Sequence, residues 1–149
     1  MANESADILL IEDNPNDIKL ALHAFKIHNL ANRIQVLRDG AEALEYLFCQ
    51  GRYASRRITD IPRLILLDLK LPLVDGLEVL RQVKGDARTQ MIPLVIMTSS
   101  QEERDIVNSY QLGINSYIVK PVDFEQFTEV VRQLGFYWLL INKPPPALG

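Results

Sequence analysis

The strongest constraint on the fold is a unit that recurs five times along the chain: a short apolar run, a helix-capping residue and then a helical pattern. The runs lack the alternation of a half-exposed strand, so they predict strands that are buried on both faces of a parallel sheet. Repeated strand–helix units imply right-handed crossovers with helices on both faces of that sheet. The pattern therefore predicts a doubly wound (βα)5 fold of the α/β class.

Capping residues mark where each helix should begin. The expected strands are 7–12, 33–38, 64–68, 94–97 and 116–119. After the first strand, Asn14 can cap a helix and Asp17 favours its positive end. We expect Ile18, Leu22 and Phe25 to form the buried stripe of this helix. Later helices should begin at the pairs Asp39/Glu42, Asp75/Glu78, Ser100/Glu103 and Asp123/Gln126.

Composition narrows the class of protein. The chain has 149 residues, 48% of them hydrophobic, which suits a globular domain and excludes a disordered one. A net charge of −3 gives no general attraction to nucleic acid or to anionic lipid. The single Cys49, the polar N-terminus and the absence of a long apolar run predict a cytoplasmic protein without a membrane segment. We expect a single domain over 1–149, with a core of about 7–135 and an apolar, proline-rich extension over 136–149.

Chemically active side chains stand at the ends of the predicted strands. In a parallel sheet of the flavodoxin-like order 2-1-3-4-5, ligands bind outside the carboxyl ends of the strands, and strands one and three are neighbours. Glu12, Asp13 and Asp68 would meet there and repel one another unless a cation lies among them. Carboxylate oxygens suit Mg²⁺. The alternative is that these acids are solvated loop residues that help the first helix to begin.

Thr98 and Lys120 follow the fourth and fifth strands and complete this constellation. A phosphorylated Asp68 would carry about two negative charges and three acceptor oxygens. An ammonium and a hydroxyl could each bind one of these oxygens, and a metal ion could bind another. Taken singly, Thr98 could bond only to backbone and Lys120 could be a solvated surface residue. The joint placement of the five residues favours a phosphoryl site.

Four motifs, Glu12-Asp13, Asp68, Thr98-Ser99 and Lys120-Pro121, resemble those of the receiver domains of bacterial two-component response regulators (CheY-like). The resemblance covers about 7–135. It implies that Asp68 takes a phosphoryl group from a phosphohistidine of a sensor histidine kinase. It also implies that Asp13, Asp68 and the backbone carbonyl of Lys70 bind Mg²⁺, with Glu12 acting through water.

The same resemblance implies a conformational switch and excludes a conventional enzyme. Thr98 and Tyr117 would move on phosphorylation, and the Lys120–Pro121 bond would be cis. The chain would only assist its own phosphorylation and dephosphorylation. With no output domain in the sequence, we expect signalling through a surface change recognised by an unknown downstream protein, without contact to nucleic acid or membrane.

Two stretches resemble a narrower group, the response regulators that partner cyanobacterial phytochromes. Residues 50–62 form a longer connection than a receiver needs and carry Arg52, Arg56 and Arg57, either as a solvated face or as a kinase-docking site. The last helix should present the core stripe Phe124, Phe127, Val131, Leu134 and Trp138, and the apolar residues after 135 exceed what one face can bury. We expect a phytochrome-type kinase as partner, and a homodimer through the fourth helix, fifth strand, fifth helix and tail.

Three other functional classes share parts of this pattern. A flavodoxin-like electron carrier would bind phosphate after the first strand, where Glu12 and Asp13 would repel it. An aspartyl-phosphate hydrolase would carry a second aspartate two residues after its nucleophile, where this chain has Lys70. A scaffold that acts without phosphorylation is the third alternative, which the complete set of strand-end residues disfavours.

Overall fold

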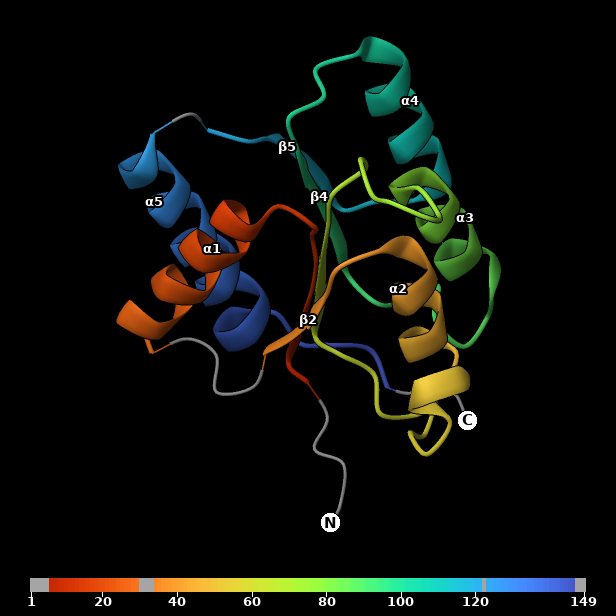
Figure 1. The fold of residues 1–149 in the computed structure, drawn as a ribbon. Coiled ribbons are helices and arrows are strands. Elements are labelled where there is room, and N and C mark those ends of the chain that lie inside the picture. The colour runs from red at the N-terminus through yellow and green to blue at the C-terminus, as the bar shows by residue number, and fades with distance from the viewer. Residues whose placement is uncertain (1–5, 30–33, 122, 147–149) are drawn as a thin grey trace.

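The computed structural model describes residues 6–29, 34–121 and 123–146. Its five-stranded parallel sheet has the order β2-β1-β3-β4-β5, as the sequence predicted (Figure 1). The strands are β1 (Ile8–Ile11), β2 (Ile34–Leu37), β3 (Leu64–Leu67), β4 (Leu94–Thr98) and β5 (Ser116–Val119). The helices are α1 (Pro15–Ile27), α2 (Gly40–Leu47), α3 (Gly76–Gly85), α4 (Glu103–Leu112) and α5 (Phe124–Gly135), with the 3-10 turn η1 (Gly51–Tyr53) and the π-helical turn η2 (Phe136–Ile141). The predicted flavodoxin-like α/β class is confirmed.

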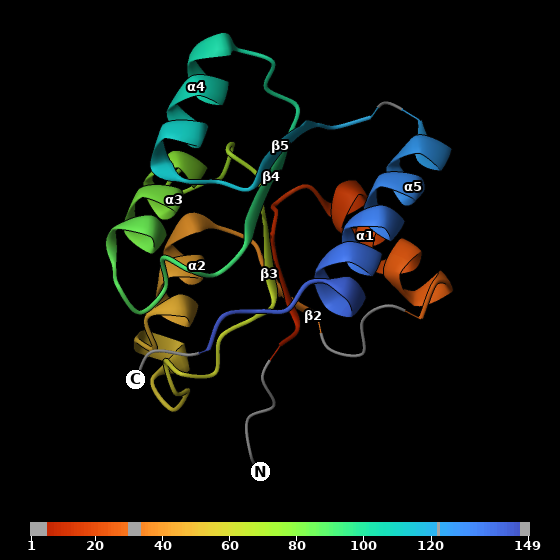
Figure 2. The same ribbon diagram turned by 180° about the vertical axis from the view of Figure 1, so that it is seen from behind.

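Helices cover both faces of the sheet. Helices α1 and α5 pack side by side on one face, and α2, α3 and α4 cover the other (Figures 1 and 2). The central strands β1 and β3 are fully buried, so each alternates its side chains between two cores. In β1, Leu9 and Ile11 face the cluster under α2 and α3, while Ile8 and Leu10 face the cluster under α1 and α5. This explains why the strand runs are continuously apolar.

Most of the predicted helix starts are confirmed by hydrogen bonds. The Asn14 side chain accepts from the backbone N–H groups of Asn16 and Asp17 at 2.9 and 3.2 Å. The Asp39, Asp75 and Asp123 side chains likewise accept from the N–H three residues on. The prediction for α4 was wrong: this helix begins at Glu103 after Glu102, without a side-chain cap. Ser100 instead donates its hydroxyl to Asp105 at 2.6 Å.

The predicted helix stripes needed correction at two exposed positions. In α1, Leu22 is 37% exposed, and Ala21 and Ala24 take the core side with Ile18 and Phe25. In α5, Phe124 is 46% exposed and stacks on His23 of α1, with ring centroids 6.2 Å apart. Alanine fits the inner face of α1 because α5 packs closely against it. Helical periodicity alone does not distinguish such small core residues from the flanks of the stripe.

The connection between α2 and β3 is packed against the domain. The Arg56 guanidinium lies 3.8 Å from the centroid of the Tyr46 ring, and it donates to the carbonyl of Asp60 at 2.8 Å. Arg52 lies within 3.7 Å of carboxylate oxygens of Glu42 and Glu45. The alternative that all three arginines form a solvated face was therefore wrong for Arg56, which is half-buried, whereas Arg57 is exposed.

The described residues contain no cis peptide bond, so the expected cis bond between Lys120 and Pro121 was wrong. The trans form is the ordinary preference of a bond before proline. Within the same residues, no helix is long and apolar enough to cross a membrane. The division into a core of about 7–135 and an extension over 136–149 stays a prediction.

Candidate functional site

Asp68 lies at the carboxyl end of β3. Its backbone N–H donates to the Ile11 carbonyl at 3.0 Å, which continues the pairing of β3 with β1. Its side chain is 7% exposed. One carboxylate oxygen accepts from the Lys70 N–H at 3.1 Å, and the other accepts from Lys120 Nζ at 3.0 Å. Burial raises the pKa of Asp68, but the Thr98 hydroxyl, the Lys120 charge and these two hydrogen bonds outweigh burial and lower the pKa. The carboxylate is therefore anionic and ready to act as a nucleophile.

Glu12 and Asp13 follow β1 and complete an acidic triad with Asp68. One carboxylate oxygen of each residue lies within 4.8 Å of the other two. Glu12 is buried and Asp13 is exposed, so the triad is open on the Asp13 side. Burial and the nearby Asp68 raise the pKa of Glu12 to about 7, although Lys120 opposes the shift. The sequence-predicted convergence of these three acids is thus present in the fold.

Lys120, after β5, lies inside this acidic group with a side chain that is 13% exposed. Its Nζ is 2.6 Å from Glu12 Oε1, 2.6 Å from Asp17 Oδ2 and 3.0 Å from Asp68 Oδ2. Burial lowers the pKa of Lys120, but the bonds to Asp17 and Glu12 outweigh burial and raise it. The alternative of a solvated surface lysine was therefore wrong.

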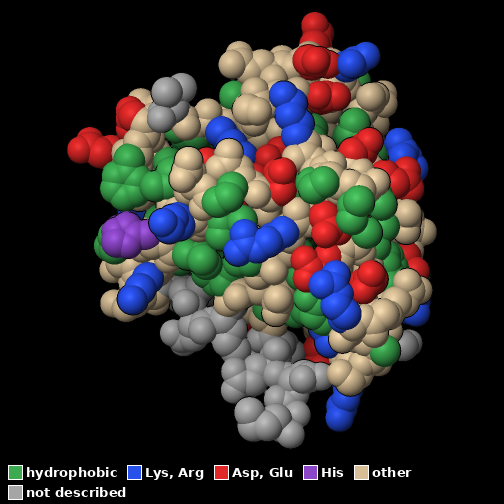
Figure 3. Space-filling model, viewed as in Figure 1, with side chains coloured by type: hydrophobic (Ala, Val, Ile, Leu, Met, Phe, Trp, Pro, Cys, Tyr) green, Lys and Arg blue, Asp and Glu red, His purple; other side chains and the backbone are tan. Residues whose placement is uncertain are grey.

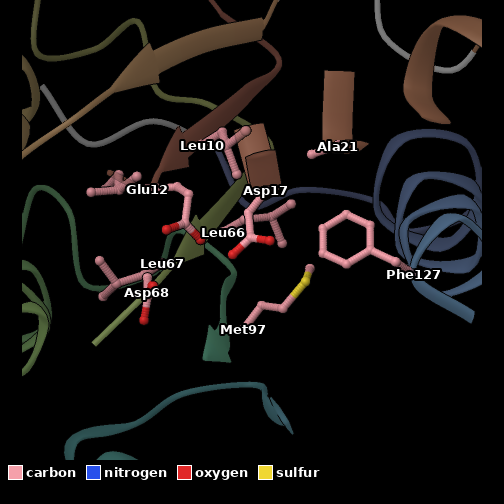
Figure 4. A pocket seen from close by; sticks show the side chains of 10 residues that line it. Leu10, Glu12, Asp17, Ala21, Leu66, Leu67, Asp68, Met97 and Phe127 are labelled. Atoms are coloured by element: carbon pink, nitrogen blue, oxygen red, sulfur yellow. The ribbon is translucent and has the colours of Figure 1, made fainter. Parts of the chain in front are cut away.

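Asp17 is a site residue that the sequence reasoning missed. It was expected only to favour the positive end of α1, and it does lie in the first turn of that helix. Its position in the first turn of the helix that follows β1 was the available signal, because this places it near the same edge of the sheet. Figure 4 shows the Glu12, Asp17 and Asp68 carboxylates around one small pocket, which apolar side chains such as Met97 and Phe127 also line.

Thr98 and Tyr117 connect this edge to the loop after β4. Thr98 is fully buried, and its hydroxyl accepts from the Ser100 N–H at 3.4 Å. Tyr117 is half-buried and donates its hydroxyl to the Ser100 carbonyl at 3.0 Å, two residues beyond Thr98. The structure thus brings the predicted phosphoryl and metal residues together and places Tyr117 one loop away. Lys70 bonds Asp68 through its backbone N–H, and its carbonyl as a metal ligand stays a prediction.

Two glycines allow the loop after β3 to approach its neighbours closely. A Cβ on Gly76 would lie 2.3 Å from the Asp68 carbonyl oxygen. A Cβ on Gly40 would lie 1.8 Å from the Val74 carbonyl oxygen. Both distances are far below van der Waals contact, and both neighbours are backbone atoms that cannot swing aside. Glycine at these positions therefore fixes the loop that carries Asp68 and Lys70.

The donor set fits a hydrated divalent cation. Carboxylate oxygens are the hard ligands that Mg²⁺ and similar ions take, usually together with water and phosphate oxygens. Beside the triad, an open hollow of about 430 Å³ is lined by residues that include Asp13, Lys70 and Asp75, which leaves room for water on the Asp13 side. The small pocket behind the acids measures only about 10 Å³, roughly the space of one water molecule.

Comparison with known proteins gives a consistent result. Residues 8–132 match the response regulator receiver domain family. The response regulator Rcp1 from Synechocystis sp. is 36% identical over 146 residues, which are 98% of this chain and 97% of Rcp1. The crystal structure of Mn²⁺-bound Rcp1 has a TM-score of 0.86 at 35% identity, covering 94% of this chain and 99% of that one.

Two further solved structures extend the comparison. The phosphorylated cyanobacterial phytochrome response regulator RcpA has a TM-score of 0.87 at 38% identity, covering 94% of this chain and 98% of that one. The bacteriophytochrome response regulator AtBRR is 52% identical with a TM-score of 0.72, covering 95% of this chain and all of that one, 100%. The acidic triad, the family match and these likenesses agree with one another. The chain belongs to the response regulator receiver domain family, and it is a signalling domain with a divalent-cation site rather than a conventional enzyme.

Proposed function

We propose that Asp68 accepts a phosphoryl group from the phosphohistidine of a sensor histidine kinase, with Mg²⁺ bound at the acidic triad. The carrying observation is the buried, anionic Asp68 carboxylate, bonded to Lys120 and within 4.8 Å of oxygens of Glu12 and Asp13. A carboxylate that is nearly buried at a strand end costs stability unless it pairs with a cationic side chain or binds a metal ion.

The residues suggest a role for each atom in the transfer. An Asp68 oxygen attacks phosphorus, the bond from phosphorus to the donor imidazole breaks, and the imidazole leaves with the electron pair. Lys120 is placed to bind a phosphoryl oxygen, because it already contacts the acceptor carboxylate. Thr98 ends the neighbouring strand β4 and is placed to bind another. Asp13, Asp68 and the Lys70 carbonyl would hold Mg²⁺, with Glu12 acting through water, and the cation would supply positive charge beside the transferring group.

Intact mass spectrometry after incubation with Mg²⁺ and acetyl phosphate tests this proposal. The wild type should gain one phosphoryl group, and Asp68→Asn should gain none. Asp13→Asn should lose labelling that rising Mg²⁺ only partly restores, because it removes a metal ligand and leaves the acceptor intact. Equal labelling of wild type and Asp68→Asn, or no labelling of either, contradicts the assignment.

A response regulator implies a cognate histidine kinase, and we propose a kinase of the phytochrome type. The likeness to RcpA, a cyanobacterial phytochrome response regulator, and to AtBRR, a bacteriophytochrome response regulator, supports this choice. The measurement is the rate of phosphotransfer from a purified phytochrome kinase and from a histidine kinase without a photoreceptor. Faster transfer from the second kinase contradicts the proposal.

We also propose a homodimer through α4, β5, α5 and the tail. The support is apolar exposure on these elements: Val107 and Tyr110 on α4 and Val119 on β5 are 46%, 51% and 37% exposed, and Ile141 in η2 is 70% exposed. Sedimentation should show a dimer at tens of micromolar, about the range of weak association. A monomer at that concentration, with and without phosphorylation, contradicts it.

The remaining proposals concern context. We propose that the chain acts in the cytoplasm as a single receiver domain, and that phosphorylation changes its surface for a downstream protein. On the face shown in Figure 3, the described Lys and Arg side chains lie among Asp and Glu side chains, and no broad basic area is visible there. That face therefore shows no nucleic-acid footprint, and together with the net charge of −3 this favours a protein partner.

A further inference from the structure

Asp17 contacts Lys120 but has no part in the phosphotransfer chemistry proposed above. Its Oδ2 lies 2.6 Å from Lys120 Nζ, across 103 positions of sequence. The Asn14 cap fixes the backbone of Asp17, since the Asn14 side chain accepts from the Asp17 N–H at 3.2 Å. The first turn of α1 is thereby tied to the connection between β5 and α5.

The distances within this group are unequal. A lysine ammonium has three N–H donors, and three carboxylates surround this one. The two shorter distances, 2.6 Å each, go to Glu12 and Asp17, and the longer one, 3.0 Å, goes to Asp68. The ammonium is therefore held most closely by the acids of β1 and α1, while it still reaches the acceptor.

We propose that Asp17 is a positioning residue, which holds the Lys120 ammonium within reach of Asp68 and prevents it from closing fully on that carboxylate. The inference rests on the proposed function. An acceptor paired tightly with an ammonium is a weaker nucleophile and a poorer metal ligand, because its charge is already neutralised. Asp17 offsets this by competing for the same donor.

The same arrangement suits the phosphorylated state. Once Asp68 is an acyl phosphate, its oxygens no longer carry the full carboxylate charge, and the third ammonium donor turns to a phosphoryl oxygen. Glu12 and Asp17 still hold the amine during this exchange, so Lys120 need not find its position again. Lys120 thus keeps its bonds to Glu12 and Asp17, and only its third bond moves from the Asp68 carboxylate to the phosphoryl group.

The simpler explanation is that Asp17 only favours the positive end of α1. Such an acid contributes modestly to helix stability and has no effect on a distant lysine. Glu103 provides the matched control, because it is an exposed acid in the first turn of α4. A helix-end effect would be alike in Asp17→Asn and Glu103→Gln.

Two measurements on folded, full-length protein separate these explanations. The first is the ¹⁵N–¹H signal of the Lys120 side-chain ammonium in the metal-free protein, assigned by its loss in Lys120→Met. The second is the maximal rate of phosphorylation by acetyl phosphate at saturating Mg²⁺. Asp17→Asn should shift the ammonium signal, speed its proton exchange and lower the maximal rate, by up to about 100-fold if the ammonium moves by about 1 Å.

Asp17→Glu keeps the charge and should recover most of the rate, and Glu103→Gln should match the wild type in both measurements. An unchanged Lys120 signal in Asp17→Asn overturns the proposal, and so does a maximal rate within about twofold of wild type. If the wild type is not phosphorylated at all, the proposed function fails, and the ammonium signal still decides whether Asp17 holds Lys120.

Discussion

Replacing Lys120 by methionine should destabilise the metal-free domain and make its stability strongly dependent on Mg²⁺. Methionine keeps most of the side-chain volume and removes the cation that contacts Glu12, Asp17 and Asp68. Removing one partner of a buried ion pair typically costs about 3–5 kcal/mol, because the remaining charge is left without compensation. We expect the lower end, about 3 kcal/mol at pH 7, since Glu12 with a pKa of about 7 can take up a proton.

Mg²⁺ should restore part of this loss. A ligand at 100 times its Kd stabilises the folded state by about 2.7 kcal/mol. Without the competing ammonium, the triad should bind Mg²⁺ more tightly, and each tenfold gain in affinity narrows the gap to wild type by about 1.4 kcal/mol. Urea unfolding, followed by the fluorescence of Trp138, the single tryptophan of the chain, measures the loss of stability without Mg²⁺ and its recovery with Mg²⁺.

Lys70→Met is the matched control, because the exposed Lys70 side chain is adjacent to the site while only its backbone N–H bonds Asp68. This variant should unfold within about 0.5 kcal/mol of wild type. The reasoning is refuted if Mg²⁺ stabilises Lys120→Met no more than it stabilises the wild type. It is equally refuted if the metal-free Lys120→Met domain is as stable as Lys70→Met.

Three further predictions use other residues. Glu12 has a pKa of about 7 against an ordinary 4.5, so between these pH values the metal-free folded state binds a proton that the unfolded state has lost, and the free energy of unfolding should fall by at most about 3 kcal/mol as pH rises from 5 to 8. Urea unfolding should show this pH dependence in the wild type, and Glu12→Gln should abolish it. Ser109 is fully buried with no hydrogen-bond partner for its hydroxyl among the described residues, so Ser109→Ala should raise the free energy of unfolding by about 1 kcal/mol, and a loss of stability would contradict this. Gly76→Ala should lower the free energy of unfolding by about 1–3 kcal/mol and slow the phosphorylation of Asp68, whereas Gly85→Ala, whose Cβ would have nothing within 4 Å, should do neither. Equal unfolding midpoints for the two variants would show that the close backbone approach at Gly76 does not affect stability.

The fold was predictable because its signals are local. The uninterrupted apolar run Leu64–Leu67 predicts a buried strand, and the caps at Asn14, Asp39, Asp75 and Asp123 predict where helices begin. The prediction failed at α4, where Ser100 bonds a side chain instead of capping the helix. A serine before a helix has several partners within reach, and the sequence does not rank them.

The strand-end rule also determined most of the site from sequence. Since parallel strands end at one edge, the apolar runs themselves place Glu12, Asp13, Asp68, Thr98 and Lys120 together. What only the tertiary structure decided is which of these groups pair and how each titrates. The pairing of Asp17 with Lys120 joins a helix start to a strand end 103 positions away, and the half-buried Arg56 over Tyr46 depends on how one connection folds back. Such contacts depend on burial and on differences in distance of a few tenths of an ångström, and no single sequence position determines either. They arise only when separate elements pack around a common core.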